Sequence, residues 1–150
     1  MNTLITPADV IRMAFTAQEG YRENVITEAD ICAAESLYIM PMIGEALYKK
    51  LHAGSYADLL EGYVAPALAA WTRYIVEPLL AARCCEGHLP TMSAVECEIL
   101  REVLRCRRRI AEALSRRLTH HLDGGSYTEY KSDANPKNCC NINGGIVQVY

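Results

Sequence analysis

Cysteine and histidine are the residues of this 150-residue chain best suited to bind a metal or attack a substrate. Seven cysteines are present, and Cys84, Cys85 and His88 lie close together in the sequence. Further ligands would have to come from two pairs, His120–His121 and Cys139–Cys140. Zinc sites usually combine two short motifs, each of two cysteines or two histidines separated by a few residues. Neither motif occurs twice here. We expect no metal site, and a zinc- or thiol-dependent protein built on Cys84, Cys85 and His88 is kept as an alternative.

Catalysis by a thiol needs a neighbouring base and a third group that orients the base. Cys85 and His88 are three residues apart, but Gly87 and Pro90 make that segment irregular and no third group is evident. The chain also lacks a glycine-rich phosphate loop, an H-E-x-x-H pair and a G-x-S-x-G turn. We therefore expect no catalytic residue, no cofactor and no enzyme activity.

The overall composition excludes several classes of protein. An odd number of cysteines, some adjacent, fits a disulfide framework poorly and favours a reducing cytosol. No apolar run approaches the ~20 residues that span a bilayer, and the N-terminus lacks a signal-peptide pattern. We expect a soluble protein with no membrane partner.

Charge is distributed unevenly along the chain. Residues 1–100 hold 6 basic and 13 acidic residues, whereas residues 101–150 hold 9 and 5, and the total is −3. A weakly acidic total is not typical of a general nucleic-acid-binding protein. The asymmetry favours attraction between different parts of two neighbouring subunits.

Arginines concentrate in one segment, residues 101–117. Arg101, Arg105, Arg108 and Glu112 follow one another by four, three and four residues, which places them on one helix face. One interpretation is a solvated face with local ion pairs, such as Glu112 with Arg116. The other interpretation is a contact surface, because an arginine can donate two hydrogen bonds at once to a carboxylate or a phosphate. The candidate interface arginines are Arg101, Arg105, Arg108, Arg109 and Arg116.

Capping signals divide the first half of the chain into helices. Thr6 with Asp9 predicts a helix that runs to about Gln18, and Thr27 with Asp30 predicts a second helix. The buried face of the second helix should carry Ile31, Ala34, Leu37 and Tyr38. Pro41 should break this helix at Met40, and residues 44–51 should form a further short helix.

Two longer helical segments follow. Residues 56–86 have an apolar face, with a break expected near Gly62–Pro66 and a kink near Pro78. Ser93 with Glu96 opens the last helix, about residues 93–122, which ends at Asp123–Gly125. Its predicted core stripe is Val95, Ile99, Val103, Cys106, Ile110, Ala113, Leu114 and Leu118.

These elements predict an all-α bundle of four to five helices in residues 1–125 and an irregular C-terminal tail in residues 126–150. The β-branched and aromatic ending, residues 146–150, is typical of a short β-strand. We include Ile146, Val147, Val149 and Tyr150 in the candidate interface. Tyr127 and Tyr130 either contact a partner or pack back on the bundle.

Three segments carry a resemblance to a known family: Leu4–Asp9, Tyr38–Leu51 and Tyr63–Trp71. They are similar to the head–tail connector (adaptor, head-completion) proteins of tailed bacteriophages and prophages. The resemblance covers about residues 3–80 and, more loosely, the last helix. Its most specific part is the Pro-x-x-Gly-x-x-Leu-Tyr pattern at Pro41–Tyr48, which has no chemical content.

The resemblance implies a small helical, non-enzymatic subunit that forms a ring with copies of itself beneath the portal. Its partners would be the portal protein and tail or adaptor proteins, with non-specific contact to DNA in the channel. It would be made in the cytoplasm of the bacterial host and end in the virion, at the head–tail junction. The seven cysteines have no evident role in such a subunit. The alternative is a small helical regulatory or nucleic-acid-associated protein that uses the arginines.

Overall fold

The computed structural model describes residues 3–20, 23–80, 83, 92–136, 138, 140–143 and 146–149. For the last two ranges and for Glu23 only the backbone is described. The helices are α1 (Pro7–Ala14), α2 (Glu28–Ala34), α3 (Met40–Ile43), α4 (Glu45–His52), α5 (Ala57–Leu59), α6 (Ala65–Val76) and α8 (Ala94–Gly124). The strands are β1 (Cys140–Asn143) and β2 (Ile146–Val149). The predicted all-α bundle is confirmed.

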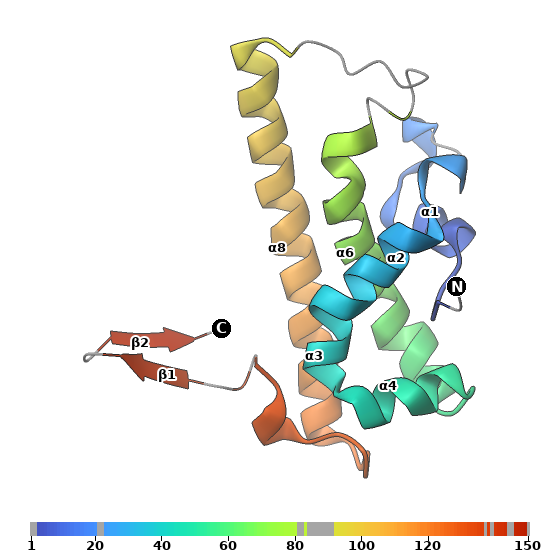
Figure 1. Ribbon diagram of the computed structural model, residues 1–150, viewed down its shortest axis with the longest axis vertical. Coiled ribbons are helices and arrows are strands. Elements are labelled where there is room, and N and C mark those ends of the chain that lie inside the picture. The colour runs from blue at the N-terminus through green and yellow to red at the C-terminus, as the bar shows by residue number, and fades with distance from the viewer. Residues whose placement is uncertain are drawn as a thin grey trace.

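Helix α6 is the centre of the bundle. It packs against α1, α2 and α8, and Figure 1 shows α8 running alongside it as the longest element. Nearly all of α6 is buried, including Ala67, Ala69 and Trp71. Its alanines let neighbouring helices approach closely, because small side chains leave room for the packing of larger ones. The core side chains lie between Ile5 and Leu122.

The helix starts predicted at Thr6, Thr27 and Ser93 are all present, and each forms a capping box. The prediction that the first helix runs to about Gln18 is wrong, because α1 ends at Ala14. Thr16 is extended and forms a further capping box with Glu19 at the start of a 3-10 turn, Ala17–Glu19. This second start signal, ten residues after the first, ends α1 early.

The predicted breaks at Pro41 and Pro66 are also wrong. The chain stays helical at both, and a π-helical turn precedes each proline: Glu35–Ile39 before α3 and Leu60–Val64 before α6. A proline ring in a regular α-helix collides with the carbonyl four residues earlier. The wider π turn accommodates that carbonyl, so the helix bends and continues. At Pro78 the chain changes to a 3-10 turn, Glu77–Leu79.

The π turns also set the direction of two tyrosines. Tyr38 and Tyr63 each lie three residues before the proline. The Tyr38 ring stacks on Trp71 with 3.8 Å between centroids, and the Tyr63 ring stacks on His121 at the same separation. Leu37, predicted to be buried, is instead 63% exposed, because the extra residue of the π turn rotates it outward.

The N-terminal segment is tied down by a buried carboxylate. Glu35 accepts a hydrogen bond from the backbone N–H of Leu4 and another from the Tyr48 hydroxyl, both at 2.6 Å. Burial, together with this carboxylate, raises the pKa of Tyr48, which keeps its hydroxyl protonated as a donor. The π turn, α4 and the chain before α1 are therefore joined at one point.

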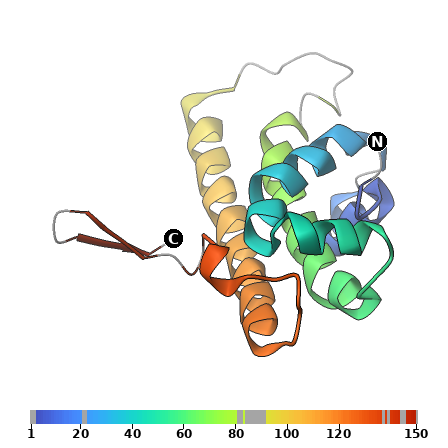
Figure 2. The same cartoon turned by 60° about the horizontal axis from the view of Figure 1, so that its bottom comes forward.

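The segment after α8 returns to the bundle before it reaches the strands. Tyr127 and Tyr130 pack against the core, which answers one of the open questions about the tail. Asp123 accepts hydrogen bonds from Tyr130, Ser132 and Asn138. Strands β1 and β2 pair antiparallel, with Cys140 opposite Val149. Figures 1 and 2 both show this hairpin standing off the bundle, and its second strand falls where the sequence predicts one.

Candidate functional site

Helix α8 presents two very different faces. The side chains that it buries in the bundle all come from its C-terminal half: Ala111, Ser115, Leu118, Thr119 and Leu122. The core stripe predicted for its N-terminal half is wrong. Val95 is 70% exposed, Ile99 59% and Ile110 50%, and Cys106 and Ala113 are exposed too. Leu118 is the member of that stripe that is fully buried, while Val103 and Leu114 are half-buried.

We call the set Val95, Ile99, Cys106 and Ile110 the outer stripe. Its members are spaced by four, seven and four residues, each close to a whole number of helical turns, so they lie on one side of α8. That side points away from the face that Leu118 and Leu122 bury against the bundle. Large apolar side chains that recur on one exposed helix face are typical of a protein-contact surface.

The arginine face, Arg101, Arg105 and Arg108, lies on the side of α8 between the outer stripe and the face that is buried in the bundle. Its side chains are 67%, 60% and 63% exposed. Each forms an ion pair of 2.8 Å along its own helix, with Glu98, Glu102 and Glu112 respectively. Glu112 thus pairs with Arg108 rather than with Arg116 as predicted. These exposed pairs contribute little to stability, so the face is free to exchange partners.

The remaining arginines of α8 differ in whether their side chains face solvent or contact the bundle. Arg109 and Arg116 are exposed, as a contact surface requires. Arg117 lies over the Tyr63 ring, 5.0 Å from its centroid. Arg107 points inward, which the sequence does not indicate: the position belongs to an unbroken run of three arginines, and only packing decides which of them faces the bundle.

Arg107 joins an ion cluster that links α6 and α8 with the 3-10 turns Ala17–Glu19 and Glu77–Leu79. Arg73, only 2% exposed, forms ion pairs of 2.6 Å with Glu19 and Glu77, and Arg107 reaches the same two carboxylates at 3.3 and 3.2 Å. Hydrogen bonding from Arg73 lowers the pKa of Glu19 to about 2. The guanidinium of Arg73 also lies 3.6 Å from the centre of the Phe15 ring. The cluster fixes the middle of α8 to the bundle.

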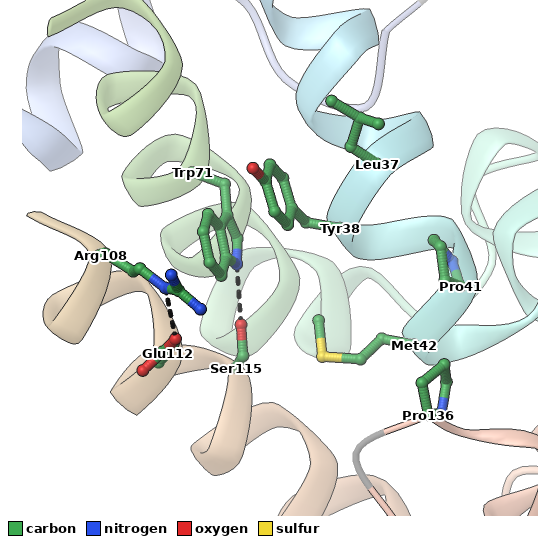
Figure 3. Close-up of a pocket in the computed structure, with 9 residues that line it drawn as sticks. All are labelled: Leu37, Tyr38, Pro41, Met42, Trp71, Arg108, Glu112, Ser115 and Pro136. Carbon is green, nitrogen blue, oxygen red and sulfur yellow. Dashed lines mark hydrogen bonds and ion pairs between the residues drawn. The ribbon is translucent and has the colours of Figure 1, made fainter. Parts of the chain in front are cut away.

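A shallow groove of about 190 Å³ lies where α8 meets the π turn before α3. Figure 3 shows Tyr38 and Trp71 side by side in it, with the indole N–H donating to Ser115 Oγ at 2.9 Å. Arg108 and Glu112 lie at its edge, already paired with each other. Because Ser115 and Glu112 are engaged with Trp71 and Arg108 and most of the lining is apolar or aromatic, this groove suits an apolar side chain.

Below the groove, aromatic residues join the end of α8 to the tail. His121 stacks on Tyr63 and its Nε2 lies 2.8 Å from the Tyr127 hydroxyl. Tyr56 meets Tyr127 edge-on and donates to Glu129 at 2.9 Å. His121 is therefore engaged in packing, while His120 is exposed. The two adjacent histidines point in different directions, so they do not form a paired metal ligand.

The other residues of the zinc and thiol alternative lie mostly outside the described residues, namely Cys84, Cys85, His88 and Cys139. In the part of the chain that the structure describes, no cluster of three or more cysteine, histidine, aspartate or glutamate residues is placed to hold a metal. Tyr150 also lies outside it, and Ile146, Val147 and Val149 are placed by backbone alone.

Comparisons with protein families, with curated proteins and with solved structures find no match to this chain. The resemblance to connector proteins stays a prediction. Among the described helices, none is long and apolar enough to cross a membrane.

Proposed function

We propose that the protein is a structural, non-enzymatic subunit of a bacteriophage or prophage head–tail connector, assembling as a ring between the portal and the tail. The observation that carries this proposal is the outer stripe of α8. A bundle with a complete core that still exposes Val95, Ile99 and Ile110 is suited to docking on another protein.

The energetics favour docking through this stripe. Burying a Val or Ile side chain completely contributes roughly 1.5–3 kcal/mol relative to leaving it exposed. Arginine, here Arg105 and Arg109 along the C-terminal half of the stripe, is also enriched in protein interfaces relative to the rest of the surface. A few such side chains therefore suffice to drive a stable contact without any reactive group.

The arginine face adds electrostatic attraction to the proposed assembly. In a ring, one surface of a subunit meets a different surface of the next. The arginines of α8 and the acidic excess of residues 1–100 are opposite in charge, which favours contact between different parts of two neighbouring subunits. Where the arginine face meets DNA in the channel, contact with phosphates would be independent of sequence and sensitive to salt.

The C-terminal hairpin offers a second route to a neighbour. A two-stranded hairpin is marginally stable in water and gains from a third strand. β1 and β2 pair with each other and stand off the bundle (Figure 1). Adding this hairpin to the backbone of the portal or of a neighbouring copy would satisfy its free edge.

The experiment is binding of the purified protein to DNA-filled heads that carry portal but no connector. Ile99→Asp with Ile110→Asp should abolish binding, because charges cannot enter an apolar contact. Leu79→Asp, also on an exposed apolar residue but outside both the outer stripe and the groove beside α8, is the matched control and should bind normally. Equal binding by all three proteins would overturn the proposal, and so would a wild-type protein that never binds heads.

Exposure of the arginine face favours the nucleic-acid-associated alternative, but the pairing of each arginine with a glutamate of the same helix counts against it. Titration of duplex binding with salt separates the two functions. The connector proposal predicts weak binding that salt removes whatever the sequence. Tight, sequence-selective binding near physiological salt would favour the alternative.

A further inference from the structure

We propose that in the free protein the outer stripe is covered by the outer stripe of a second copy, with the two α8 helices antiparallel. This inference rests on the proposed function in one respect, since it concerns the surface that assembly on the portal would use. The partner is the same chain, so the contact is a two-fold one in which each residue pair occurs twice.

The spacing of the stripe is symmetric about its midpoint. Val95 and Ile110 are equally far from the point between residues 102 and 103, and so are Ile99 and Cys106. A two-fold axis at that point places Val95 opposite the partner copy's position 110 and Ile99 opposite its position 106. All four apolar side chains of each copy then meet apolar side chains, as in the seam of an antiparallel coiled coil.

The charges along one flank of the stripe select the antiparallel orientation. Glu98 and Glu102 flank its N-terminal half and are 61% and 57% exposed. Arg105 and Arg109 follow on the same flank in the C-terminal half and are exposed as well. Antiparallel pairing brings the acidic half of each helix against the basic half of the other. Parallel pairing would place this flank of each helix against the opposite flank of the other, so these charges would not meet.

The dimer and the ring use the stripe in incompatible ways. Rotation about one ring axis leaves every α8 with the same direction along that axis, so ring neighbours cannot present antiparallel copies of it. The dimer must therefore open before the stripe contacts a ring neighbour or the portal. Because a two-fold contact closes after two copies, it protects the stripe from unlimited association in the free state.

The first test is the mass of the free protein by sedimentation equilibrium. Wild type should give twice the 16.7 kDa of one chain, and Ile99→Asp should give the single-chain mass. Leu79→Asp, which lies outside the outer stripe, should keep the double mass. Circular dichroism should show equal helix content in all three, since both substituted residues are exposed. A wild-type mass of one chain or of a ring, or an Ile99→Asp dimer, would overturn the proposal.

The second test is orientation, read by disulfide mapping of Ile99→Cys under mild oxidation. Antiparallel pairing predicts a peptide in which Cys106 is linked to the new cysteine at position 99 of the other copy. A dominant link between the two copies' Cys106 residues would overturn the antiparallel arrangement.

Charge substitutions supply an independent check on the same flank. Glu98→Arg with Glu102→Arg should give single chains, and so should Arg105→Glu with Arg109→Glu. Mixing the two variants should restore the double mass, because every flank contact is then between opposite charges. Single chains in the mixture would contradict the proposed charge pairing.

These outcomes are separable from the proposed function. A free protein that is monomeric yet binds portal-bearing heads through the outer stripe overturns the dimer and leaves the connector proposal standing. A dimer that passes the mass and mapping tests but never binds heads overturns the connector proposal and leaves the dimer standing.

Discussion

Both halves of α8 carry large apolar side chains at helical spacing, but these side chains are buried in one half and exposed in the other. In the C-terminal half Leu118 and Leu122 are buried against the bundle, whereas in the N-terminal half Val95 and Ile99 face outward. The boundary lies near the ion cluster, where Arg107 reaches Glu19 and Glu77. Beyond it α8 continues toward its N-terminus with an apolar side that the bundle does not cover.

The difference shows that a helical stripe defines a helix face without saying what covers it. In the first half of α8 the half-buried positions are Cys97, Leu100, Val103, Leu104 and Arg107. The side turned toward the bundle is therefore largely separate from the more regular outer stripe. We infer that the two stripes serve different contacts, one within the chain and one between chains.

The largest effect expected within this comparison comes from Leu118→Ala, which should lower the free energy of unfolding by about 2–5 kcal/mol. It removes buried apolar volume that the surroundings refill only partly. Ile99→Ala should change the unfolding free energy of the single chain by no more than about 0.5 kcal/mol. Urea denaturation at low protein concentration measures both. Similar losses for the two variants would mean that the first half of α8 is packed as tightly as the second.

Acid should weaken the attachment of α8 at the ion cluster. The pKa of Glu19 is lowered from 4.5 to about 2. Unfolded chains therefore take up a proton at this group between pH 4.5 and 2 while folded chains do not. Stability from this pair is full above pH 4.5 and is lost as pH falls toward 2, by at most about 3 kcal/mol.

The Glu19→Gln variant isolates this contribution. It should be less stable than wild type at neutral pH and should lose less stability between pH 5 and 2, as thermal melting across that range would show. Glu45→Gln, which removes an exposed partner of Lys49, is the matched control and should follow wild type. Parallel melting curves for wild type and Glu19→Gln would show that the cluster does not hold α8.

A smaller effect is expected at the bond between α6 and the buried half of α8. Ser115→Ala removes the acceptor of the Trp71 indole N–H and leaves a buried donor unpaired, which costs about 1–3 kcal/mol. Ser115→Thr keeps a hydroxyl and should recover part of the loss. Chemical denaturation of both variants, with Trp71 fluorescence as the signal, provides the measurement. No difference between alanine and wild type would show that this hydrogen bond is dispensable.

The smallest effect should come from the arginine face. Arg101→Gln breaks an ion pair whose partners are 67% and 61% exposed, and such pairs contribute between 0 and about 1 kcal/mol. Its melting temperature should stay close to that of wild type at any salt concentration. A marked loss of stability would mean that the face is part of the fold rather than a free surface.

Local signals in the sequence predicted the parts of the fold that depend on local physics. The capping boxes at Thr6, Thr27 and Ser93 each fix a helix start through two hydrogen bonds within four residues. The all-α class and the terminal strand follow from periodicity and composition in the same way. The π turns before Pro41 and Pro66 were missed because helix interruption is the usual effect of proline, and tertiary packing of Tyr38 and Tyr63 favours the alternative.

The candidate site could be predicted only in part. The exposure of Arg101, Arg105 and Arg108 was among the alternatives that their spacing allows. The apolar residues of the outer stripe were recognised but assigned to the core, since spacing alone does not tell a covered face from a free one. The inward turn of Arg107 depends on Glu19, which lies far away in the sequence and meets it through folding.

The most direct test of the outer stripe as a protein-contact surface is the reaction rate of the Cys106 thiol with a maleimide. Mass spectrometry of the peptide that contains Cys106 separates it from the other cysteines. We predict fast labelling of dilute protein and strong protection at high concentration or on portal-bearing heads. Labelling of Cys106 at one unchanged rate, whatever the concentration and whether or not heads are present, would contradict the account.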